Sequence, residues 1–423
     1  MALAARWDLE IRQLDAVNAF PNCELDEEVY IELPDGFKAS GKVGRLLRAL
    51  YGLRRSPLLW QKLLSSALQE LGLQAGKEEP CIFLNNHLIV FFFVDDICYM
   101  FRACDQAITD EFRDDIDNRF KIRDLGELRW FLGIRVTRDR SKRRLWLCQD
   151  SYIESIATRF NLICDGLAPT TPIGTQHLVP NEDIANHAFT HLYQRKIGSI
   201  LYPAIITRPD IAFTAARLSS FLTNPSPDHM AAANRCIQYL YGSRHLAILF
   251  DGLNNPEEKA FKVYTDALFA DDMQDRKSTQ GYLFTLFGGP IAWKSGKQPT
   301  VTTSSTEAEL LALSTAAKEA IAAVRLFRDV RLQLNEGLTI WCDNKQIIRL
   351  VNDDMMRIQS ELRHVDIHNC WVRQEAKKGQ FEVKYLPTNE MPADGLTKAL
   401  DKGKFERFVA QLGLTLLPEI EIA

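Results

Sequence analysis

Two adjacent acidic residues interrupt the most apolar part of this 423-residue chain. Asp95 and Asp96 separate residues 87–94 from residues 97–101, and both runs have the length and composition of buried strands. A plain hairpin tip is one interpretation, because Asp is common in tight turns. However, the usual turn-forming Gly or Asn is absent, and adjacent like charges between buried strands repel each other. The pattern therefore predicts a divalent-cation site, since Mg²⁺ prefers carboxylate oxygens.

A third acid is expected on a neighbouring strand to complete such a site. Asp15 fits this expectation, because it ends another apolar strand and Phe20 follows it five residues later. Between these segments, residues 57–73 have leucines at helical spacing and Gly72 at the end, which predicts a helix.

A second group of acids is spread over the C-terminal part of the chain. Asp266 and Asp343 each follow a predicted strand, residues 261–265 and 338–342. Glu307 and Glu309 open a long predicted helix, residues 306–332, and Asp394 begins the last helical run. Each has a structural alternative: Glu307 could complete a capping box with Ser304, and Asp394 could stabilise a helix N-terminus.

Composition limits the classes of partner and compartment. With 46% apolar and 25% charged residues the chain is globular, and its net charge of −4 gives no overall attraction to nucleic acid. A polyanion would need local basic stretches, such as the one containing Arg54 and Arg55, although a solvated surface is the alternative reading. The nine scattered cysteines without a Cys-x-x-Cys pair indicate reduced thiols. Together with the missing signal peptide and membrane-length apolar run, they predict an intracellular protein, cytoplasmic or nuclear, without a membrane partner.

The motifs around the first acids resemble those of reverse transcriptases. Residues 93–96 are similar to the Tyr-x-Asp-Asp hairpin, and Asp15 with Phe20 resembles the first catalytic motif, in which the aromatic residue is a steric gate. Further segments resemble the copia-type LTR retrotransposon polymerase in particular: residues 25–30, 34–37, 50–60 and 124–133. This resemblance implies that Asp15, Asp95 and Asp96 hold two Mg²⁺ ions, with Mn²⁺ as a substitute, roughly 3.5–4 Å apart.

The order Asp–Glu–Asp–Asp of the second group resembles the ribonuclease H fold. Residues 275–282 and 304–309 are similar to copia-type RNase H domains. The resemblance implies that Asp266, Glu309, Asp343 and Asp394 bind two metal ions that activate water against the RNA strand of an RNA/DNA hybrid. Glu309 is preferred to Glu307 because the Glu-Leu-Leu-Ala pattern that starts at Glu309 matches the catalytic Glu of the family.

The sequence thus predicts an α+β multidomain chain. The expected parts are a truncated reverse-transcriptase palm at 1–165, a helical thumb or connection at 166–260, an α/β RNase H-like domain at 261–400 and a tail at 401–423. The implied activities are RNA-directed DNA synthesis and RNase H cleavage, with RNA template, DNA primer, dNTPs and RNA/DNA hybrid as partners.

The polymerase half is expected to be weak or inactive. Only about a dozen residues precede Asp15, where the family has a fingers region with basic residues that contact the triphosphate. Two alternatives remain: a catalytically dead nucleic-acid-binding remnant, and an unstable product of a decayed element. The sequence leaves the oligomeric state open.

Overall fold

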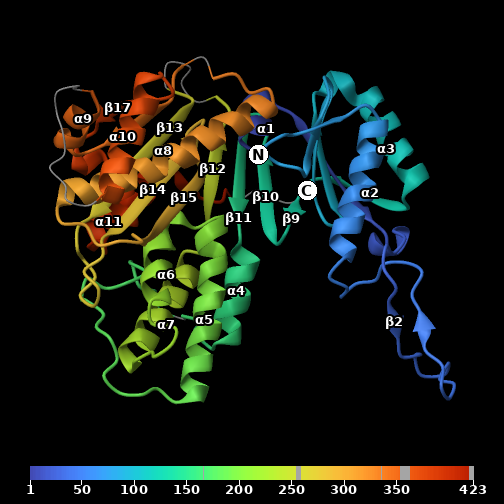
Figure 1. The fold of residues 1–423 in the computed structure, drawn as a ribbon, viewed down its shortest axis with the longest axis horizontal. Coiled ribbons are helices and arrows are strands. Elements are labelled where there is room, and N and C mark those ends of the chain that lie inside the picture. Colours follow the sequence, from blue (N-terminus) through green and yellow to red (C-terminus); the bar gives the residue numbers. More distant parts are fainter. Residues whose placement is uncertain (165, 254–258, 335, 353–362, 419–423) are drawn as a thin grey trace. The chain divides into compact units, whose positions relative to one another are not determined.

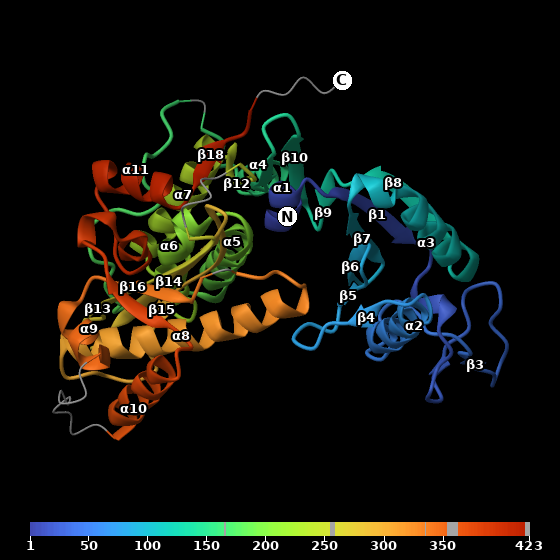
Figure 2. The same cartoon turned by 90° about the horizontal axis from the view of Figure 1, so that it is seen from above.

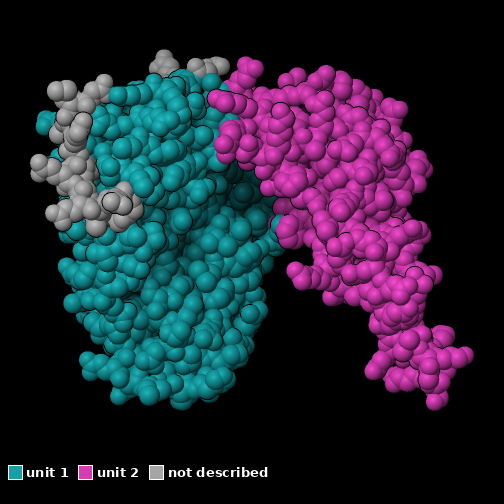
Figure 3. All heavy atoms as spheres, viewed as in Figure 1, with its two compact units in different colours: residues 1–6, 132–324, 334–423 teal, residues 7–131, 325–333 magenta. Residues whose placement is uncertain are grey.

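The computed structural model describes residues 1–164, 166–253, 259–334, 336–352 and 363–418. The chain divides into two compact units, which Figure 3 shows in different colours. Unit 1 comprises residues 1–6, 132–324 and 334–423, and unit 2 comprises residues 7–131 and 325–333.

Unit 2 is built on a six-stranded antiparallel sheet with the order β4-β5-β6-β7-β1-β8. The predicted strands 87–94 and 97–101 are present as β6 and β7, which pair with each other. The strands of the sheet are β1 (Glu10–Ala16), β4 (Gln74–Ala75), β5 (Ile82–Leu84), β6 (Leu88–Phe93), β7 (Asp96–Phe101) and β8 (Ile122–Glu127).

Helices α2 (Ser56–Glu70) and α3 (Gln106–Arg119) share one core with this sheet (Figure 1). The leucine spacing that predicted a helix at 57–73 places Leu64 and Leu68 on the buried face of α2, beside Trp60. Burying each of these side chains stabilises the fold by roughly 1.5–3 kcal/mol. The core thus fixes the β6–β7 hairpin and α2 in one packed body. Smaller elements of unit 2 are β2 (Tyr30–Ile31), β3 (Gly44–Arg45), β9 (Trp130–Phe131), η1 (Phe20–Asn22) and η2 (Ala103–Asp105).

The C-terminal part of unit 1 contains a five-stranded mixed sheet with the order β15-β14-β13-β16-β17. β13 pairs antiparallel with β14 and parallel with β16, and β16 pairs parallel with β17. Parallel neighbouring strands such as β13 and β16 need a crossover connection. Helix α8, which follows β15 and precedes β16 in the chain, is part of that connection. These strands are β13 (Phe261–Leu268), β14 (Thr279–Leu286), β15 (Gly289–Lys297), β16 (Thr339–Cys342) and β17 (Glu382–Tyr385).

Helices cover both faces of this sheet. Figure 2 shows α8 (Ser305–Asp329) on one face and α5 (His187–Ile206) and α6 (Ala212–Ser219) on the other. The predicted helix 306–332 is confirmed as α8, which ends three residues earlier. Its buried alanines allow a close approach to the strands; they are Ala308, Ala312, Ala316, Ala317 and Ala320. The remaining elements on this side of unit 1 are α9 (Lys345–Asn352), α10 (Arg363–Lys377), η4 (Thr388–Glu390), η5 (Pro392–Leu396) and α11 (Lys402–Gln411).

A further sheet in unit 1 contains the strand order β18-β12-β11-β10. Its strands come from three of the predicted parts, namely 1–165, 166–260 and 401–423. The domain boundaries expected from the sequence remain predictions. The helices expected between residues 166 and 260 include α5, which begins at His187 because the Asn186 side chain caps it. The elements are β10 (Ile134–Asp139), β11 (Arg144–Cys148), β12 (Leu246–Asp251), β18 (Leu414–Leu416), α1 (Ala2–Trp7), α4 (Asp150–Arg159), η3 (Pro209–Ile211) and α7 (Pro227–Gly242).

Within the described ranges, no helix is both long enough and apolar enough to cross a bilayer.

Candidate metal-binding acid groups

Parallel strands β13 and β16 bring Asp266 and Asp343 together. The last paired positions are Tyr264 and Trp341. Asp266 and Asp343 each lie two residues further along, so continuing the register places them opposite each other. Neighbouring parallel strands end at the same edge of a sheet, which is why two acids far apart in the sequence become neighbours.

Glu309 joins these two aspartates from the second turn of α8. Its carboxylate, the Cys342 thiol and the Asp343 carboxylate have ligand atoms that all lie within 4.8 Å of one another. Glu309 is only 7% exposed, and its Oε2 atom has no hydrogen-bond partner in the described part of the chain. Burial, followed by the charges of Asp266 and Asp343, raises the pKa of Glu309 well above its usual value.

Asp266 is similarly enclosed, with 6% of its surface exposed. Burial raises the pKa of Asp266 to about 6, the Thr397 hydroxyl opposes this shift, and the charges of Asp343 and Asp394 add to it. The Thr397 hydroxyl donates to Asp266 Oδ2 at 2.5 Å. Asp343 is held in the same manner, since the Thr388 hydroxyl donates to its Oδ2 at 2.7 Å. The group therefore concentrates negative charge in a poorly solvated place.

Asp394 enters the group from η5, which packs closely on the sheet. A Cβ at Gly281 of β14 would lie 2.7 Å from Leu396 Cβ, and one at Gly395 would lie 2.5 Å from the Phe408 ring. A side chain at Gly281 would therefore push η5 away from the sheet, and a side chain at Gly395 would push η5 away from α11. Lys398 forms an ion pair with Asp394, and its charge also works against the rise in the pKa of Asp266.

Glu307 has a structural role at the start of α8. Its Oε2 accepts from the Thr303 amide at 2.6 Å and from the Thr303 hydroxyl at 2.8 Å, while Ser304 Oγ accepts from the Glu307 amide at 3.2 Å. This is the predicted cap, except that the carboxylate reaches Thr303 instead of Ser304. The arrangement favours Glu309 as the candidate ligand.

The acids of unit 2 lie at the β6–β7 hairpin. Phe93 pairs with Asp96, so Val94 and Asp95 form the two-residue tip and Asp96 begins β7. Val94 has φ of 56°, a left-handed conformation that is unfavourable for a β-branched residue. The Trp60 indole donates to the Val94 carbonyl at 2.6 Å and holds this tip. Backbone strain of this kind is concentrated at functional sites.

Asp15 completes the group from β1. It lies opposite Asp96 on β7 and opposite Arg123 on β8, whose guanidinium is 4.0 Å from the Asp15 carboxylate. Gln13 donates to Asp96 Oδ1 at 2.9 Å. Burial raises the pKa of Asp96, the Gln13 hydrogen bond opposes this, and the charges of Asp95 and Asp15 add to the rise. The structure thus brings the three predicted acids of the first group together.

The predicted substrate-binding residues have different surroundings. Phe20 is buried, and its ring centroid is 4.4 Å from that of Tyr51. The Tyr51 hydroxyl donates to Asp95 Oδ2 at 3.5 Å. Arg55 pairs with Asp26, whereas Arg54 is exposed. Their contacts with a substrate stay predictions.

Sequence reasoning missed several side chains that hold the acids. Thr397 and Cys342 lie within three residues of predicted acids, and this nearness in sequence was the available signal. Gln13 is likewise two residues from Asp15. Tyr51 and Thr388 reach their carboxylates from distant segments, which no local pattern indicates.

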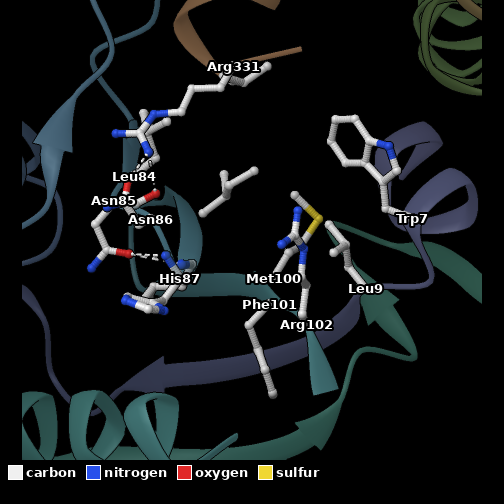
Figure 4. A pocket seen from close by; sticks show the side chains of 13 residues that line it. Trp7, Leu9, Leu84, Asn85, Asn86, His87, Met100, Phe101, Arg102 and Arg331 are labelled. Carbon is white, nitrogen blue, oxygen red and sulfur yellow. Dashed lines mark hydrogen bonds between the residues drawn. The ribbon is translucent and has the colours of Figure 1, made fainter. Parts of the chain in front are cut away.

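Unit 2 also contains a hollow that none of the predicted site residues lines. Its volume is about 300 Å³, and Figure 4 shows the apolar Trp7 and Leu9 opposite the polar Asn85 and Asn86, with Arg331 nearby. Arg331 donates to the Asn85 carbonyl at 3.2 Å. The described residues that line the hollow include no carboxylate, so it belongs to neither acid group.

Comparisons with known proteins cover nearly the whole chain. A family profile described as reverse transcriptase (RNA-dependent DNA polymerase) matches residues 1–175. The retrovirus-related Pol polyprotein from transposon TNT 1-94 of Nicotiana tabacum is 34% identical over 421 residues, covering 96% of this chain and 31% of the polyprotein. The polyprotein from transposon RE1 of Arabidopsis thaliana is 31% identical over 420 residues, with shares of 96% and 28%. The chain therefore spans about a third of the length of these relatives.

A solved structure supports the fold. The foamy viral protease–reverse transcriptase in complex with RNA/DNA hybrid superposes with a TM-score of 0.50 and 14% identity, covering 90% of this chain and 44% of that chain. At this identity the likeness concerns the fold alone. Together with the sheets described above, it confirms the predicted α+β multidomain fold.

Proposed function

Because the chain belongs to the copia-type retrotransposon Pol family, as a reverse transcriptase and RNase H region, we propose that its unit 1 acid group cleaves the RNA strand of RNA/DNA hybrids. The observation that carries this proposal is the buried Glu309 Oε2 atom without a hydrogen-bond partner in the described chain, beside Asp343 and near Asp266. The charges of neighbouring carboxylates help to raise the pKa of Asp266 and of Glu309, so the group needs a cation when all of its members are ionised.

The donor set fits a hard divalent cation. Glu309, Asp266, Asp343 and Asp394 offer carboxylate oxygens, which are the ligands that Mg²⁺ prefers. A bound Mg²⁺, or Mn²⁺ in its place, would supply Lewis acidity that acidifies a water molecule and neutralises charge on the scissile phosphate.

The residues of the chain provide the positioning. Thr397 fixes the Asp266 carboxylate and Thr388 fixes Asp343, so both acids are oriented before a substrate arrives. Lys398 limits the rotation of Asp394. Lys345, stacked on the Tyr385 ring with its Nζ 4.8 Å from the centroid, provides a cation two residues after Asp343. We expect Lys345 to contact phosphates of the hybrid.

Hydrolysis of a labelled RNA strand in an RNA/DNA hybrid by the purified chain tests this function. We expect Mg²⁺-dependent cleavage that EDTA stops and that Asp343→Asn reduces by at least about 10²-fold, since a ligand carboxylate is lost. Asp95→Asn is the matched control and should leave cleavage unchanged. No cleavage by the unaltered chain, or equal cleavage by Asp343→Asn, would refute the proposal.

For unit 2 we propose RNA-directed DNA synthesis at Asp15, Asp95 and Asp96, with RNA template, DNA primer and dNTPs as substrates. The support is the cross-strand pairing of Asp15 with Asp96 beneath the strained hairpin tip. Nucleotide incorporation on a primed RNA template tests it, and Asp95→Asn should abolish incorporation while Asp343→Asn should not.

A second candidate for unit 2 is nucleic-acid binding without turnover. Arg123 near Asp15 favours it, because a guanidinium neutralises part of the charge that would otherwise attract a metal ion. Salt-sensitive binding of template–primer without incorporation, retained in Asp95→Asn, would support this candidate over synthesis.

A further inference from the structure

Cys342 places a sulfur atom inside the unit 1 acid group. Its Sγ lies with oxygens of Glu309 and Asp343 in a set whose members are all within 4.8 Å of one another. The side chain is fully buried, and the Asn344 amide donates to Sγ at 3.4 Å. A thiol contributes nothing to a Mg²⁺ site, since that ion selects oxygen ligands.

We propose that Glu309, Cys342 and Asp343 form a binding site for a soft divalent cation, of the class of Zn²⁺ or Cd²⁺, which competes with Mg²⁺ for the same carboxylates. Mixed thiolate and carboxylate ligands select such ions, whereas Mg²⁺ gains nothing from sulfur. The binding itself is independent of the proposed nuclease function. Its consequence, inhibition of hybrid cleavage, rests on that function.

The strands hold the sulfur in place for this role. Cys342 is the last residue of β16, which is paired on one side with β13 and on the other with β17, where Cys342 lies opposite Tyr385. Its backbone therefore cannot move away from the group. In a tetrahedral zinc site, sulfur and oxygen ligands lie about 3.5 Å apart. The separations in the set, all within 4.8 Å, are close to this value.

Glu309 supplies the second independent observation. Its Oε2 atom is buried and lacks a hydrogen-bond partner in the described chain, and a carboxylate oxygen of Glu309 lies in the same set as the sulfur. An oxygen in that condition gains a partner when a cation binds. Asp343 is half-buried, which leaves a path from solvent, and Thr388 occupies only its Oδ2 atom.

Binding would proceed by ligand exchange without redox chemistry. The Cys342 S–H bond breaks, its proton passes to solvent, and the sulfur lone pair forms the bond to the cation. The ion then occupies carboxylates that hybrid cleavage requires. Three protein ligands leave at least one coordination position for water, which distinguishes the site from a closed structural zinc site.

The test is a titration of the full, reduced chain with Cd²⁺, followed through the ultraviolet charge-transfer absorption of the Cd²⁺–thiolate bond. We expect absorption that Cys342→Ser reduces by one Cd²⁺ per chain, while Cys370→Ser, a change at an exposed cysteine, retains that component. Glu309→Gln should weaken the Cys342-dependent binding by about 10–100-fold. Excess Mg²⁺ should lower the apparent Cd²⁺ affinity.

The same titration on Cys342→Ala separates ligand loss from misfolding, provided that circular dichroism shows a native melting transition. Absorption that is identical in Cys342→Ser and the unaltered chain would overturn the proposal, as would Cd²⁺ affinity unaffected by Glu309→Gln. A Cys342-dependent Cd²⁺ site in a chain that cleaves no hybrid would uphold the metal site and refute the nuclease function, so the two failures are distinguishable.

Discussion

The two acid groups differ in how the fold treats their charge. In unit 1, Asp266 and Glu309 are 6% and 7% exposed, burial raises the pKa of both, and Asp266 accepts a hydrogen bond from the neutral hydroxyl of Thr397. In unit 2, the Asp15 side chain is 32% exposed and has Arg123 at 4.0 Å. Asp15 therefore has both water and a guanidinium beside it, whereas in unit 1 Lys398 pairs with Asp394 and the carboxylates of Asp266 and Glu309 remain almost fully buried.

This difference shows which group depends more on a cation. Burying ionised carboxylates without a counter-charge costs several kcal/mol, so the unit 1 group opposes folding unless it is protonated or binds a metal ion. Retaining these carboxylates despite their free-energy cost indicates that their negative charge has a function. The unit 2 group has a lower cost and hence gives weaker physical support for a bound metal ion, although its strained hairpin tip indicates a functional constraint.

The largest effect should separate the two glutamates of α8. Glu309→Gln is expected to reduce hybrid cleavage by at least about 10²-fold, because a buried ligand oxygen is replaced by an amide. Glu307→Gln keeps an acceptor for Thr303 and should change the rate by less than about threefold, with a stability loss of roughly 0.5–1 kcal/mol. Steady-state cleavage rates and melting curves of both variants check this, and the reverse ranking would show that the ligand has been misassigned.

The next effect concerns the stability of the metal-free chain. Asp266→Asn removes a buried charge while keeping an acceptor for Thr397, so at pH 7 it should increase the free energy of unfolding by about 2–3 kcal/mol. Asp96→Asn in unit 2 should give a smaller gain, since Asp96 is less buried and accepts a hydrogen bond from Gln13. Denaturant unfolding in EDTA measures both. An equal or larger gain in the free energy of unfolding for Asp96→Asn would contradict the expected difference between the two acid groups.

The pH dependence of that gain has a definite sign. The pKa of Asp266 is about 6 in the folded chain, above the roughly 3.9 of an unfolded chain, so the folded state binds more protons between these values. The stability associated with the protonated carboxyl is complete below the unfolded value and is lost as the pH rises through about 6. The gain from Asp266→Asn should therefore shrink from pH 7 to pH 4. A gain that is independent of pH would show that Asp266 is not the group that titrates.

The smallest effect lies in unit 2. Trp60→Phe removes the indole that donates to the Val94 carbonyl and should destabilise the chain by roughly 1–2 kcal/mol through the lost hydrogen bond and reduced packing. Because Trp60 and Val94 both belong to unit 2, hybrid cleavage by unit 1 should remain. Equal loss of cleavage and of primer extension would contradict the separate roles of the two units.

Sequence patterns predicted elements where local periodicity and burial agree. The leucines of α2 and the apolar runs of β6 and β7 are examples. The acidic residues themselves were predicted from sequence motifs. The structure places Asp15 opposite Asp96 and Asp343 close to Glu309. The left-handed Val94 runs against its local propensity, because the Trp60 hydrogen bond holds it from a distant helix.

Long-range partners were beyond the reach of sequence reasoning. Three hydrogen-bonded pairs are examples, because loops whose paths no local pattern fixes separate the two members of each pair. The pairs are Thr388 with Asp343, Tyr51 with Asp95, and Arg55 with Asp26. The pairing of β12 with β18 is another case, since the sequence placed these strands in different parts of the chain. Such contacts follow from the packed fold and not from the composition of either segment.

Thermal unfolding with and without Mg²⁺ tests the central claim most directly, namely that the unit 1 acids need a cation. Mg²⁺ should stabilise the unaltered chain by an amount that grows with concentration, by about 2.7 kcal/mol at a hundredfold excess over the dissociation constant. Most of this stabilisation should be lost in Glu309→Gln, and most of it should persist in Asp95→Asn. Mg²⁺ stabilisation that survives Glu309→Gln but is lost in Asp95→Asn, or that is absent from the unaltered chain, would contradict the account.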